Sequence, residues 1–588
     1  LWLQLKWPIP GRIALSGSFG EMRTYTMHMG IDIPTGERIG EVPVLAAGEG
    51  YVFRIRVSHG GFGKVVYVRH PQGLITVYGH LSHFAPKGEA IVEALQQAQK
   101  RFEVEKFLGP EEWRVRAGDT LGWAGNSGYS FGPHLHFEVR TLRDEPLSPL
   151  KYLPALRDTE PPVFFRVGLS PLSRDAHIQG RSERTFFPLR QVSRSSQKRI
   201  YICPETIRVS GKVGFLYTAA DRSGGGTAWL GLRQLALIGP SGALLYKAQW
   251  ETLDFDWRRF LKWHVDYAYQ QVYRIGVGRL YDPSVPFPWS SGSGVIEVPP
   301  GVMTTYILQA EDYAGNQAEV RITLSGDSAS TSIRYYPLHP RRLWDIEEGL
   351  LRVRSVFFTS QKDTISPTKP LWLGGRLVDT LFSPDGKAFP TYVRACVPPG
   401  VPYELPLTAA CTLRIFSETL QDTLYLRVEP DKSIFGEGLL IGDPYIPLRF
   451  PAELIWRIPE NMRIEKSYPL FRPWYEEVWS PVRGAQRVGR VWRIPVRSWG
   501  AYVVMEDNTP PQIRPLKPAG PFYLVSIEDL GSGVNPYSFR ISSEKGVVYP
   551  EYYEPQRILY LPRRKGRRFT IEVSDYVRNQ TRTQLSFQ

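Results

Sequence analysis

The first clear pattern in the chain is a strict alternation of apolar and polar residues in residues 27–33. His28, Gly30 and Asp32 alternate there with methionine and isoleucine. A period of two predicts a β-strand with His28 and Asp32 on one face and the apolar residues on the other. Gly30 lies between the two polar side chains and has no side chain of its own, which leaves room for an ion.

Two later segments, residues 75–81 and 134–139, show the same alternation and also predict strands. The polar residues that alternation places on one face of each strand are Thr76, Tyr78 and His80 in the first and His134, His136 and Glu138 in the second. A glycine-rich turn over residues 125–132 precedes the second of these segments and would bring it sharply into place.

Histidine is concentrated in this part of the chain, since most of the ten histidines lie between His28 and His136. Three strands that each turn imidazoles or a carboxylate to one face are explained if those faces meet around a metal ion. Two imidazoles and one carboxylate suit Zn²⁺, and three protein ligands leave a fourth position for water. The pattern therefore predicts a zinc site.

The three segments resemble the three motifs of the M23 metallopeptidases, the LytM/lysostaphin type. The residues that carry the resemblance are His28-x-Gly30-x-Asp32, Tyr78-Gly79-His80-Leu81 and Gly132-Pro133-His134-Leu135-His136-Phe137. The resemblance covers about residues 10–155 and implies an antiparallel catalytic domain over residues 1–155. It also implies that His28, Asp32 and His136 hold zinc and that His80 and His134 are the catalytic histidines.

The activity implied by the resemblance is that of a zinc metalloendopeptidase, in which a zinc-activated water attacks the scissile carbonyl. The implied substrate is the peptide cross-link of bacterial peptidoglycan, and the implied location is the cell envelope, periplasmic or secreted. Two alternatives remain open at this point. The chain could be a non-catalytic envelope scaffold or regulator with an M23 fold, or an endopeptidase that acts on an envelope or extracellular protein.

Three further residues near the motifs have two interpretations each. Glu138 either orients a metal ligand or is a solvated surface carboxylate. Arg23 either contacts substrate or forms a structural salt bridge. Tyr78 either donates a hydrogen bond to the oxyanion or packs in the core, and packing is the favoured interpretation.

The stretch between the second and third motifs is longer than an M23 core needs, which indicates an insertion at about residues 84–117. Apolar residues at helical spacing in this stretch predict an amphipathic helix over Glu89–Lys106. It resembles an insertion found in M23 proteins of Bacteroidetes-like bacteria. Packing against the sheet is the favoured role; a lid over the cleft, and hence a latent enzyme, is the alternative.

The rest of the chain predicts further β domains, so that the whole is an all-β dominated multidomain protein. An opening that begins with aspartate and contains a Pro-Pro pair, at residues 158–163, recurs at 507–512. Each is followed by an aspartate turn and a last strand, as in bacterial immunoglobulin-like β-sandwiches. We therefore expect immunoglobulin-like sandwiches over residues 156–330 and 507–588, with β-rich structure of uncertain boundaries over 331–506.

The composition of the 588-residue chain favours some classes of binding partner and argues against others. A net charge of +14 favours an anionic partner such as peptidoglycan or another envelope polymer. No cluster of basic residues alternates with stacking aromatics, which argues against specific nucleic-acid binding, and no run of about 18 apolar residues predicts a transmembrane span. Of the three cysteines, Cys396 and Cys411 could pair or all could be inert thiols. The sequence does not indicate an oligomeric state.

Overall fold

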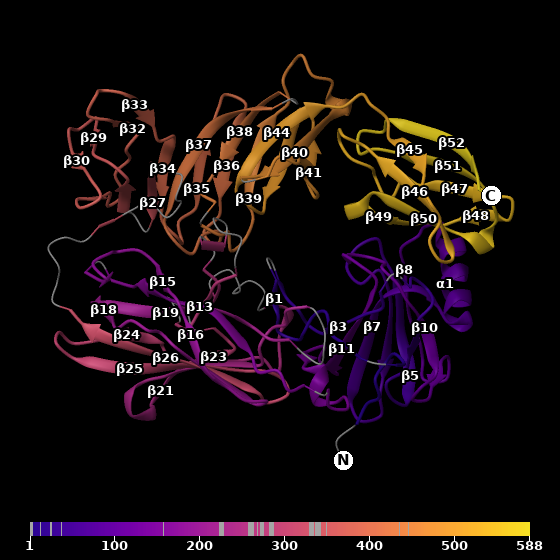
Figure 1. Cartoon of the computed structure of the whole chain (residues 1–588). Helices are drawn as coiled ribbons and strands as arrows, with labels where there is room; N and C mark the ends of the chain where they lie inside the picture. The colour runs from indigo at the N-terminus through magenta and orange to yellow at the C-terminus, as the bar shows by residue number, and fades with distance from the viewer. Residues whose placement is uncertain are drawn as a thin grey trace.

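The protein is built almost entirely from antiparallel β-sheets, which confirms the predicted fold class (Figure 1). The computed structural model describes all residues except 1–3, 12, 24–25, 37, 157, 174, 223–227, 257–263, 267–268, 271–275, 282–286, 328–333, 336–342, 348–349, 434–435, 445, 475 and 588. No helix among the described residues is long and apolar enough to cross a membrane.

The N-terminal domain is organised around one large antiparallel sheet. Its strands, with the short β1–β2 hairpin, are β1 (Met22–Arg23), β2 (Thr26–Met27), β3 (Ile31–Pro34), β4 (Pro43–Leu45), β5 (Gly50–Val57), β6 (Lys64–Arg69), β7 (Leu74–Phe84), β8 (Val104–Phe107), β9 (Arg114–Val115), β10 (Thr120–Ala124), β11 (His134–Thr141) and β12 (Pro146–Leu147). The main path runs β12-β11-β7-β6-β5-β8, and β3 pairs with β11 on the side where the histidines gather.

The insertion contains one helix, α1 (Pro86–Gln99), followed by strand β8. The helix begins earlier than predicted because Pro86 stands in its first turn, where a proline needs no N–H partner. The predicted extension to Lys106 is wrong, because residues 104–107 pair with β5. Val92 and Phe102 are buried in the core of the domain, so the insertion packs against the sheet as favoured.

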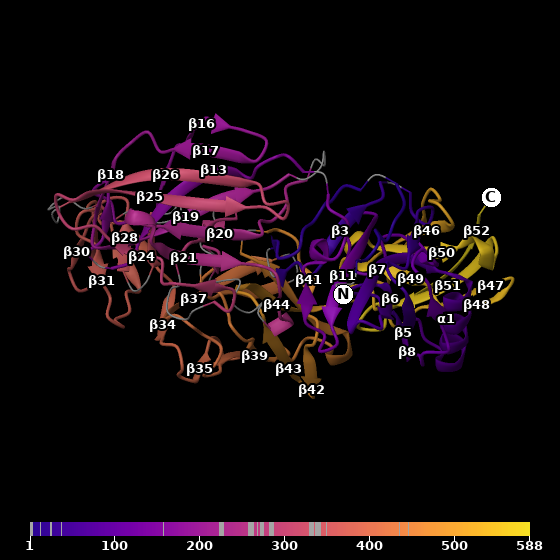
Figure 2. The ribbon, with the colours of Figure 1, turned by 90° about the horizontal axis from the view of Figure 1, so that it is seen from below.

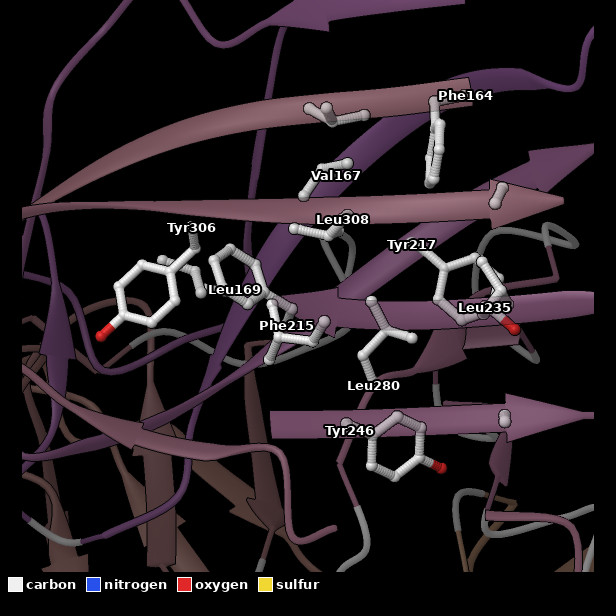
Figure 3. Close-up of a cluster of buried hydrophobic side chains, with 14 of the residues drawn as sticks. Phe164, Val167, Leu169, Phe215, Tyr217, Leu235, Tyr246, Leu280, Tyr306 and Leu308 are labelled. Atoms are coloured by element: carbon white, nitrogen blue, oxygen red, sulfur yellow. The ribbon is translucent and has the colours of Figure 1, made fainter. Parts of the chain in front are cut away.

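The second part of the chain is a two-sheet β-sandwich. Its strands are β13 (Val163–Pro171), β14 (His177–Ile178), β15 (Thr185–Phe187), β16 (Arg190–Arg194), β17 (Lys198–Ile202), β18 (Ile207–Ser210), β19 (Lys212–Ala220), β20 (Gln234–Ile238), β21 (Leu244–Gln249), β22 (Gly278–Arg279), β23 (Ser290–Ser291), β24 (Val295–Glu297), β25 (Met303–Glu311) and β26 (Gln317–Gly326). Side chains of β13 and β19 face those of β20 and β25 across the core (Figure 3).

Residues 344–506 form two cores rather than one. The smaller core is formed mainly by β27 (Trp344–Glu347), β28 (Leu350–Val353), β29 (Phe357–Thr359), β30 (Thr364–Ile365), β31 (Leu371–Trp372), β32 (Thr380–Phe382) and β33 (Ala388–Pro390). The larger core lies between two sheets made of β34 (Val393–Val397), β35 (Tyr403–Pro406), β36 (Cys411–Ile415), β37 (Leu424–Ser433), β38 (Gly436–Ile441), β39 (Ala452–Arg457), β40 (Ser467–Pro473), β41 (Ser480–Pro481), β42 (Gln486–Val488), β43 (Val491–Val496) and β44 (Gly500–Glu506). Cys203, Cys396 and Cys411 are all free thiols.

The C-terminal module is a second, smaller sandwich with its own core. Its strands are β45 (Gln512–Pro515), β46 (Phe522–Glu528), β47 (Arg540–Ser543), β48 (Gly546–Val548), β49 (Glu551–Tyr553), β50 (Ile558–Pro562), β51 (Arg568–Ser574) and β52 (Gln580–Ser586). In both views of the whole chain this module returns to lie beside the N-terminal domain (Figures 1 and 2). The first and last domains of the chain are thus neighbours in space.

Direct side-chain contacts hold the C-terminal module against the N-terminal domain. Arg564 bonds to Glu89 and Glu93 on α1 at 2.5 and 2.6 Å. Lys64 of β6 forms an ion pair with Glu551 of β49. These contacts place the last module next to the loops that surround the predicted metal site.

Candidate metal centre and active site

Strand pairing brings two of the three predicted metal ligands directly opposite each other. In the β3–β11 pair, Asp32 is the register partner of His136. His28 lies just before β3, and Gly30 between it and Asp32 allows close packing on β11. A Cβ atom at Gly30 would lie 2.4 Å from the Phe137 carbonyl oxygen and 2.8 Å from Glu138 Cγ, so no other residue fits there.

The three predicted ligands form a nearly equilateral triangle of donor atoms. His28 Nε2 lies 3.0 Å from Asp32 Oδ1 and 3.0 Å from His136 Nδ1, and the latter two atoms are 2.9 Å apart. All three residues are buried. Ligands about 2.0–2.1 Å from a tetrahedral metal are separated by about 3.3 Å, so a small relaxation of this triangle would accommodate Zn²⁺.

Hydrogen bonds on the far side of each imidazole orient it toward the centre of the triangle. His28 Nδ1 donates to the Ser18 carbonyl oxygen at 2.8 Å, which turns Nε2 inward. His136 Nε2 donates to Glu138 Oε1 at 2.8 Å, which turns Nδ1 inward. Partners of this kind fix the tautomer and raise the basicity of a metal-binding histidine. The donor set therefore fits zinc.

The charges around the triangle favour a cation at its centre. Burial raises the pKa of Asp32, but the imidazoles of His28, His134 and His136 outweigh it and hold that pKa well below its usual value. Burial lowers the pKa of His136, but its hydrogen bonds to Asp32 and Glu138 raise it to about 9. The inward-facing nitrogen of His136 thus holds a proton tightly, and a metal ion would take that proton's place.

Arg23 forms a salt bridge with the predicted metal ligand Asp32. Its guanidinium donates to Asp32 Oδ2 at 2.6 Å, on the oxygen that does not face the two imidazoles. Of the two interpretations of Arg23, the structure shows the salt bridge. This bond helps to fix which oxygen of Asp32 points into the triangle.

The two predicted catalytic histidines lie next to each other beside the triangle. The ring centroids of His80 and His134 are 4.8 Å apart, and His134 Nε2 is 3.3 Å from Asp32 Oδ1. His80 Nδ1 donates to the Ser127 carbonyl oxygen at 2.7 Å, and His134 Nδ1 lies 2.8 Å from the Gly132 carbonyl oxygen. Both rings therefore direct Nε2 toward the metal-ligand side.

Burial and the neighbouring histidines His134 and His136 lower the pKa of His80 well below its usual value. The ring is therefore neutral at physiological pH. Because Nδ1 carries the proton that bonds to Ser127, Nε2 has a free electron pair. A neutral imidazole in this state can accept a proton from a reacting group.

The prediction that Thr76, Tyr78 and His80 share one face of a strand is wrong. Tyr78 opposes Phe137 in the β7–β11 pair, and its hydroxyl oxygen accepts a hydrogen bond from the Ala47 N–H at 2.8 Å, so it lies in the core. His80 has a φ of +60°, a left-handed conformation that breaks the alternation and turns its side chain to the opposite face. The packing interpretation of Tyr78 is confirmed, and Tyr78 is not an oxyanion donor.

One contact of the site had no signal in the sequence pattern, whereas a second involves Glu138, which the alternation had already placed on the face of His136. Phe62, in the loop between β5 and β6, stacks on the His136 ring with centroids 5.1 Å apart. Glu138 is fully buried and also accepts a hydrogen bond from Arg140 Nε at 2.5 Å. Of the two interpretations of Glu138, the structure shows the one in which it orients a ligand.

A large cleft of about 1280 Å³ is lined by Phe62, whose ring stacks on His136, but not by any of the five predicted site residues themselves. On the N-terminal domain it is lined by the loop that carries Phe62 and by Gly128 and Tyr129. The opposite wall comes from residues 468–484 and from the C-terminal module. Tyr553 of that module also donates a hydrogen bond to the Ser130 carbonyl oxygen, in the loop that precedes His134.

The β-sandwich that contains strands β13–β26 supports the segment that carries His28. Ser18, whose carbonyl oxygen accepts the His28 hydrogen bond, bonds through its hydroxyl to the Gly231 N–H at 2.7 Å. Phe19, Met27 and Met29 are buried in the core of the sandwich rather than in that of the N-terminal domain. The segment that carries the predicted metal ligand His28 is thus anchored between two modules.

We expect a fragment of residues 1–155 to bind zinc weakly and to aggregate, because Met27, Met29 and Phe19 would lose the core in which they are buried. A fragment of residues 1–327 keeps that core and is expected to bind zinc almost as the full chain does. Zinc per chain and the melting temperature of the two fragments test this. Equal zinc affinity in both would contradict it, and faster cleavage by residues 1–155 would instead support latency.

The antiparallel sheet gathers two imidazoles and a carboxylate, which could hold a metal ion, beside two further histidines. The family model "Peptidase family M23" matches residues 26–149, the segment that contains the whole arrangement. The chain therefore contains an M23 peptidase domain.

Among proteins of known name, the DD-carboxypeptidase/endopeptidase Mpg of Neisseria meningitidis is 33% identical over 129 residues, which are 22% of this chain and 23% of Mpg. The peptidoglycan DD-endopeptidase ShyA of Vibrio cholerae is 27% identical over 154 residues, 25% of this chain and 29% of ShyA. The chain thus matches about a quarter of the length of these relatives. A zinc-containing peptidase from Vibrio cholerae, of known structure, is 26% identical and covers 25% of this chain and 40% of its own, with a TM-score of 0.19.

Proposed function

We propose that the protein is a zinc metalloendopeptidase that hydrolyses the peptide cross-links of bacterial peptidoglycan. The observation that carries the proposal is the triangle of His28 Nε2, Asp32 Oδ1 and His136 Nδ1 with two further histidines beside it. Structural zinc sites are closed by four protein ligands, whereas catalytic sites use three and leave one position for water or substrate. A site with three ligands, bordered by side chains that can accept a proton, is suited to hydrolysis.

Zinc held by His28, Asp32 and His136 would act as a Lewis acid and lower the pKa of water toward about 7. The protein supplies the proton transfers. Neutral His80 and its neighbour His134 both direct Nε2 to the same space, so the pair provides an acceptor for the proton of the attacking water. Once one ring is protonated, it can donate to the carbonyl oxygen as that oxygen gains negative charge, or to the leaving amine.

The cleft beside the site supports a polymeric or cross-linked substrate. It is lined by exposed aromatic side chains such as Tyr129 and Tyr537, and by charged side chains of both signs. One wall belongs to the M23 domain and the other to later modules, so an extended peptide bound near His80 would contact both. The likeness to ShyA, which is named as a peptidoglycan DD-endopeptidase, and the net charge of +14 favour a cell-wall substrate and a location in the cell envelope.

The proposal is tested by incubating the zinc-loaded full chain with purified sacculi and separating the released muropeptides. We expect cross-linked dimers to decrease and monomers to increase, and a chelator to stop the reaction until zinc is restored. Casein serves as the comparison substrate. Cleavage of casein without any change in sacculi would favour an envelope or extracellular protein as substrate, and bound zinc without any cleavage would favour a scaffold.

A further inference from the structure

Two clusters of three aspartates lie outside the predicted zinc site, one in each sandwich at the ends of the chain's accessory region, and four of the six aspartates are buried. The first contains Asp158, Asp221 and Asp312, and the second contains Asp507, Asp529 and Asp575. Within each cluster, one oxygen atom of every carboxylate lies within 4.8 Å of those of the other two. Three like charges at this separation repel one another strongly in a buried setting.

The last aspartate of each cluster is held by the same set of hydrogen bonds. Asp312 Oδ1 accepts from the backbone N–H groups two and four residues later, at 2.8 and 2.9 Å, and Oδ2 accepts from Asn316 Nδ2 at 2.9 Å. Asp575 makes the equivalent bonds at 3.0, 2.7 and 2.7 Å, the last from Asn579. The same hydrogen-bonding arrangement around an aspartate thus occurs in both sandwiches.

The first aspartate of each cluster belongs to the segment that enters the sandwich from the preceding domain. Asn316 Nδ2 also donates to the Asp158 carbonyl oxygen at 3.3 Å, and Asn579 Nδ2 to the Asp507 carbonyl oxygen at 3.1 Å. Asp507 directly follows β44, the last strand of the domain before it. Each cluster therefore joins an incoming linker to two loops of the next module.

The middle aspartate of each cluster has a carboxylate oxygen without a partner. Asp221 is only 4% exposed, and its buried Oδ1 has no hydrogen-bond partner among the residues that the structure describes. The buried Oδ2 of Asp529 likewise has none within the described part of the chain. An unsatisfied buried carboxylate oxygen costs free energy unless a cation or a proton occupies the space beside it.

Burial and neighbouring carboxylates raise the pKa of Asp221 and of Asp529, and they outweigh the opposing influence of Arg199 on the first and of Arg557 on the second. Burial and the carboxylates of Asp312 and Asp158 raise the pKa of Asp221 to about 8, with Arg199 as an opposing influence. Burial and the carboxylates of Asp507 and Asp529 likewise raise the pKa of Asp575 to about 7. The negative charges of Asp221 and Asp575 are thus not compensated by the residues around them, whereas Asp507, despite its burial, has its pKa lowered by hydrogen bonds from Ser532 and Thr509.

We propose that each aspartate cluster binds one hard divalent cation, Ca²⁺ above all, which locks the linker to the sandwich that follows it. The donors are all oxygen atoms, with no histidine or cysteine, which suits Ca²⁺ and not a zinc ion. Backbone carbonyls and water would complete the six to eight oxygen ligands that Ca²⁺ takes. The cation would thereby fix the orientation of each of the two sandwiches relative to the domain before it.

The experiment uses the full chain, stripped with a calcium-selective chelator and assayed at pH 7.5 with Ca²⁺ alone. We expect two Ca²⁺ per chain by isothermal titration calorimetry, with Kd values of about 10⁻⁴–10⁻³ M as in extracellular modules, and a higher melting temperature with 5 mM Ca²⁺. Asp221→Asn and Asp529→Asn should each remove one equivalent and part of the thermal shift. Asp385→Asn, which makes the same charge change at an exposed site, should remove neither.

Wild-type protein that neither binds Ca²⁺ nor changes its melting temperature would overturn the proposal, and this outcome does not depend on how the variants fold. Proton uptake by the clusters in place of Ca²⁺ would also overturn it. In that case the melting temperature should respond to pH between about 6 and 8 but not to Ca²⁺.

Discussion

Replacement of His136 by alanine is expected to abolish both zinc binding and peptide hydrolysis, whereas His134→Ala should abolish hydrolysis alone. His136 Nδ1 is one corner of the donor triangle, and its loss leaves only two ligands for the metal. His134 lies beside the triangle and next to His80, where it serves proton transfer. We expect zinc per chain to fall from near one to below about 0.1 in His136→Ala, and activity to fall about 10²–10⁴-fold in zinc-loaded His134→Ala.

Zinc content by atomic emission and muropeptide release from sacculi measure the two effects separately. His83→Ala is the matched control, because His83 is a histidine of the same domain that stacks on Trp123 outside the site. It should keep both zinc and activity. His134 Nε2 lies 3.3 Å from Asp32 Oδ1, so loss of zinc in His134→Ala would mean that His134 is a ligand and that the assignment of roles is wrong.

Alternation along the chain was enough to predict which side chains of β3 and β11 meet. Period-two patterning placed Asp32 and His136 on the faces that the β3–β11 register brings together, because both strands are regular there. The same reasoning failed at His80, where a single left-handed residue reverses the face. The pattern of apolar and polar residues carries no information about the φ angle of a single residue. The change of face at His80 could therefore not be predicted from it.

The helix of the insertion and the contacts between domains show a second limit of prediction from the sequence. Apolar spacing found the helix of the insertion, but it also matched residues 104–106, which pair with β5 because a strand partner is available there. The bond between Ser18 and Gly231 joins residues 213 positions apart, and no local pattern carries that information. The repeated aspartates, in contrast, were visible as turn motifs, and only the structure shows that they converge.

Glu138 is expected to control both zinc affinity and stability, and paired substitutions separate the two effects. Glu138 is fully buried and bridges His136 Nε2 to Arg140 Nε. Glu138→Gln should weaken zinc binding about 10–100-fold, because a neutral partner orients and polarises the imidazole less well. Among the described residues, Glu138→Ala leaves the buried Arg140 with only the exposed Asp144 as an acidic partner, which should cost about 3–5 kcal/mol of unfolding free energy.

The double variant Glu138→Leu/Arg140→Met removes both charges and is expected to regain most of that stability, because an apolar pair of similar volume avoids an unpaired buried cation. It should not regain zinc affinity, since His136 still lacks its carboxylate. Chemical denaturation and competition with a zinc chelator measure the two quantities, with the exposed Glu111→Gln as control. If stability and zinc affinity recovered together, Glu138 would act on the metal only by holding the fold, and its role in orienting His136 would be refuted.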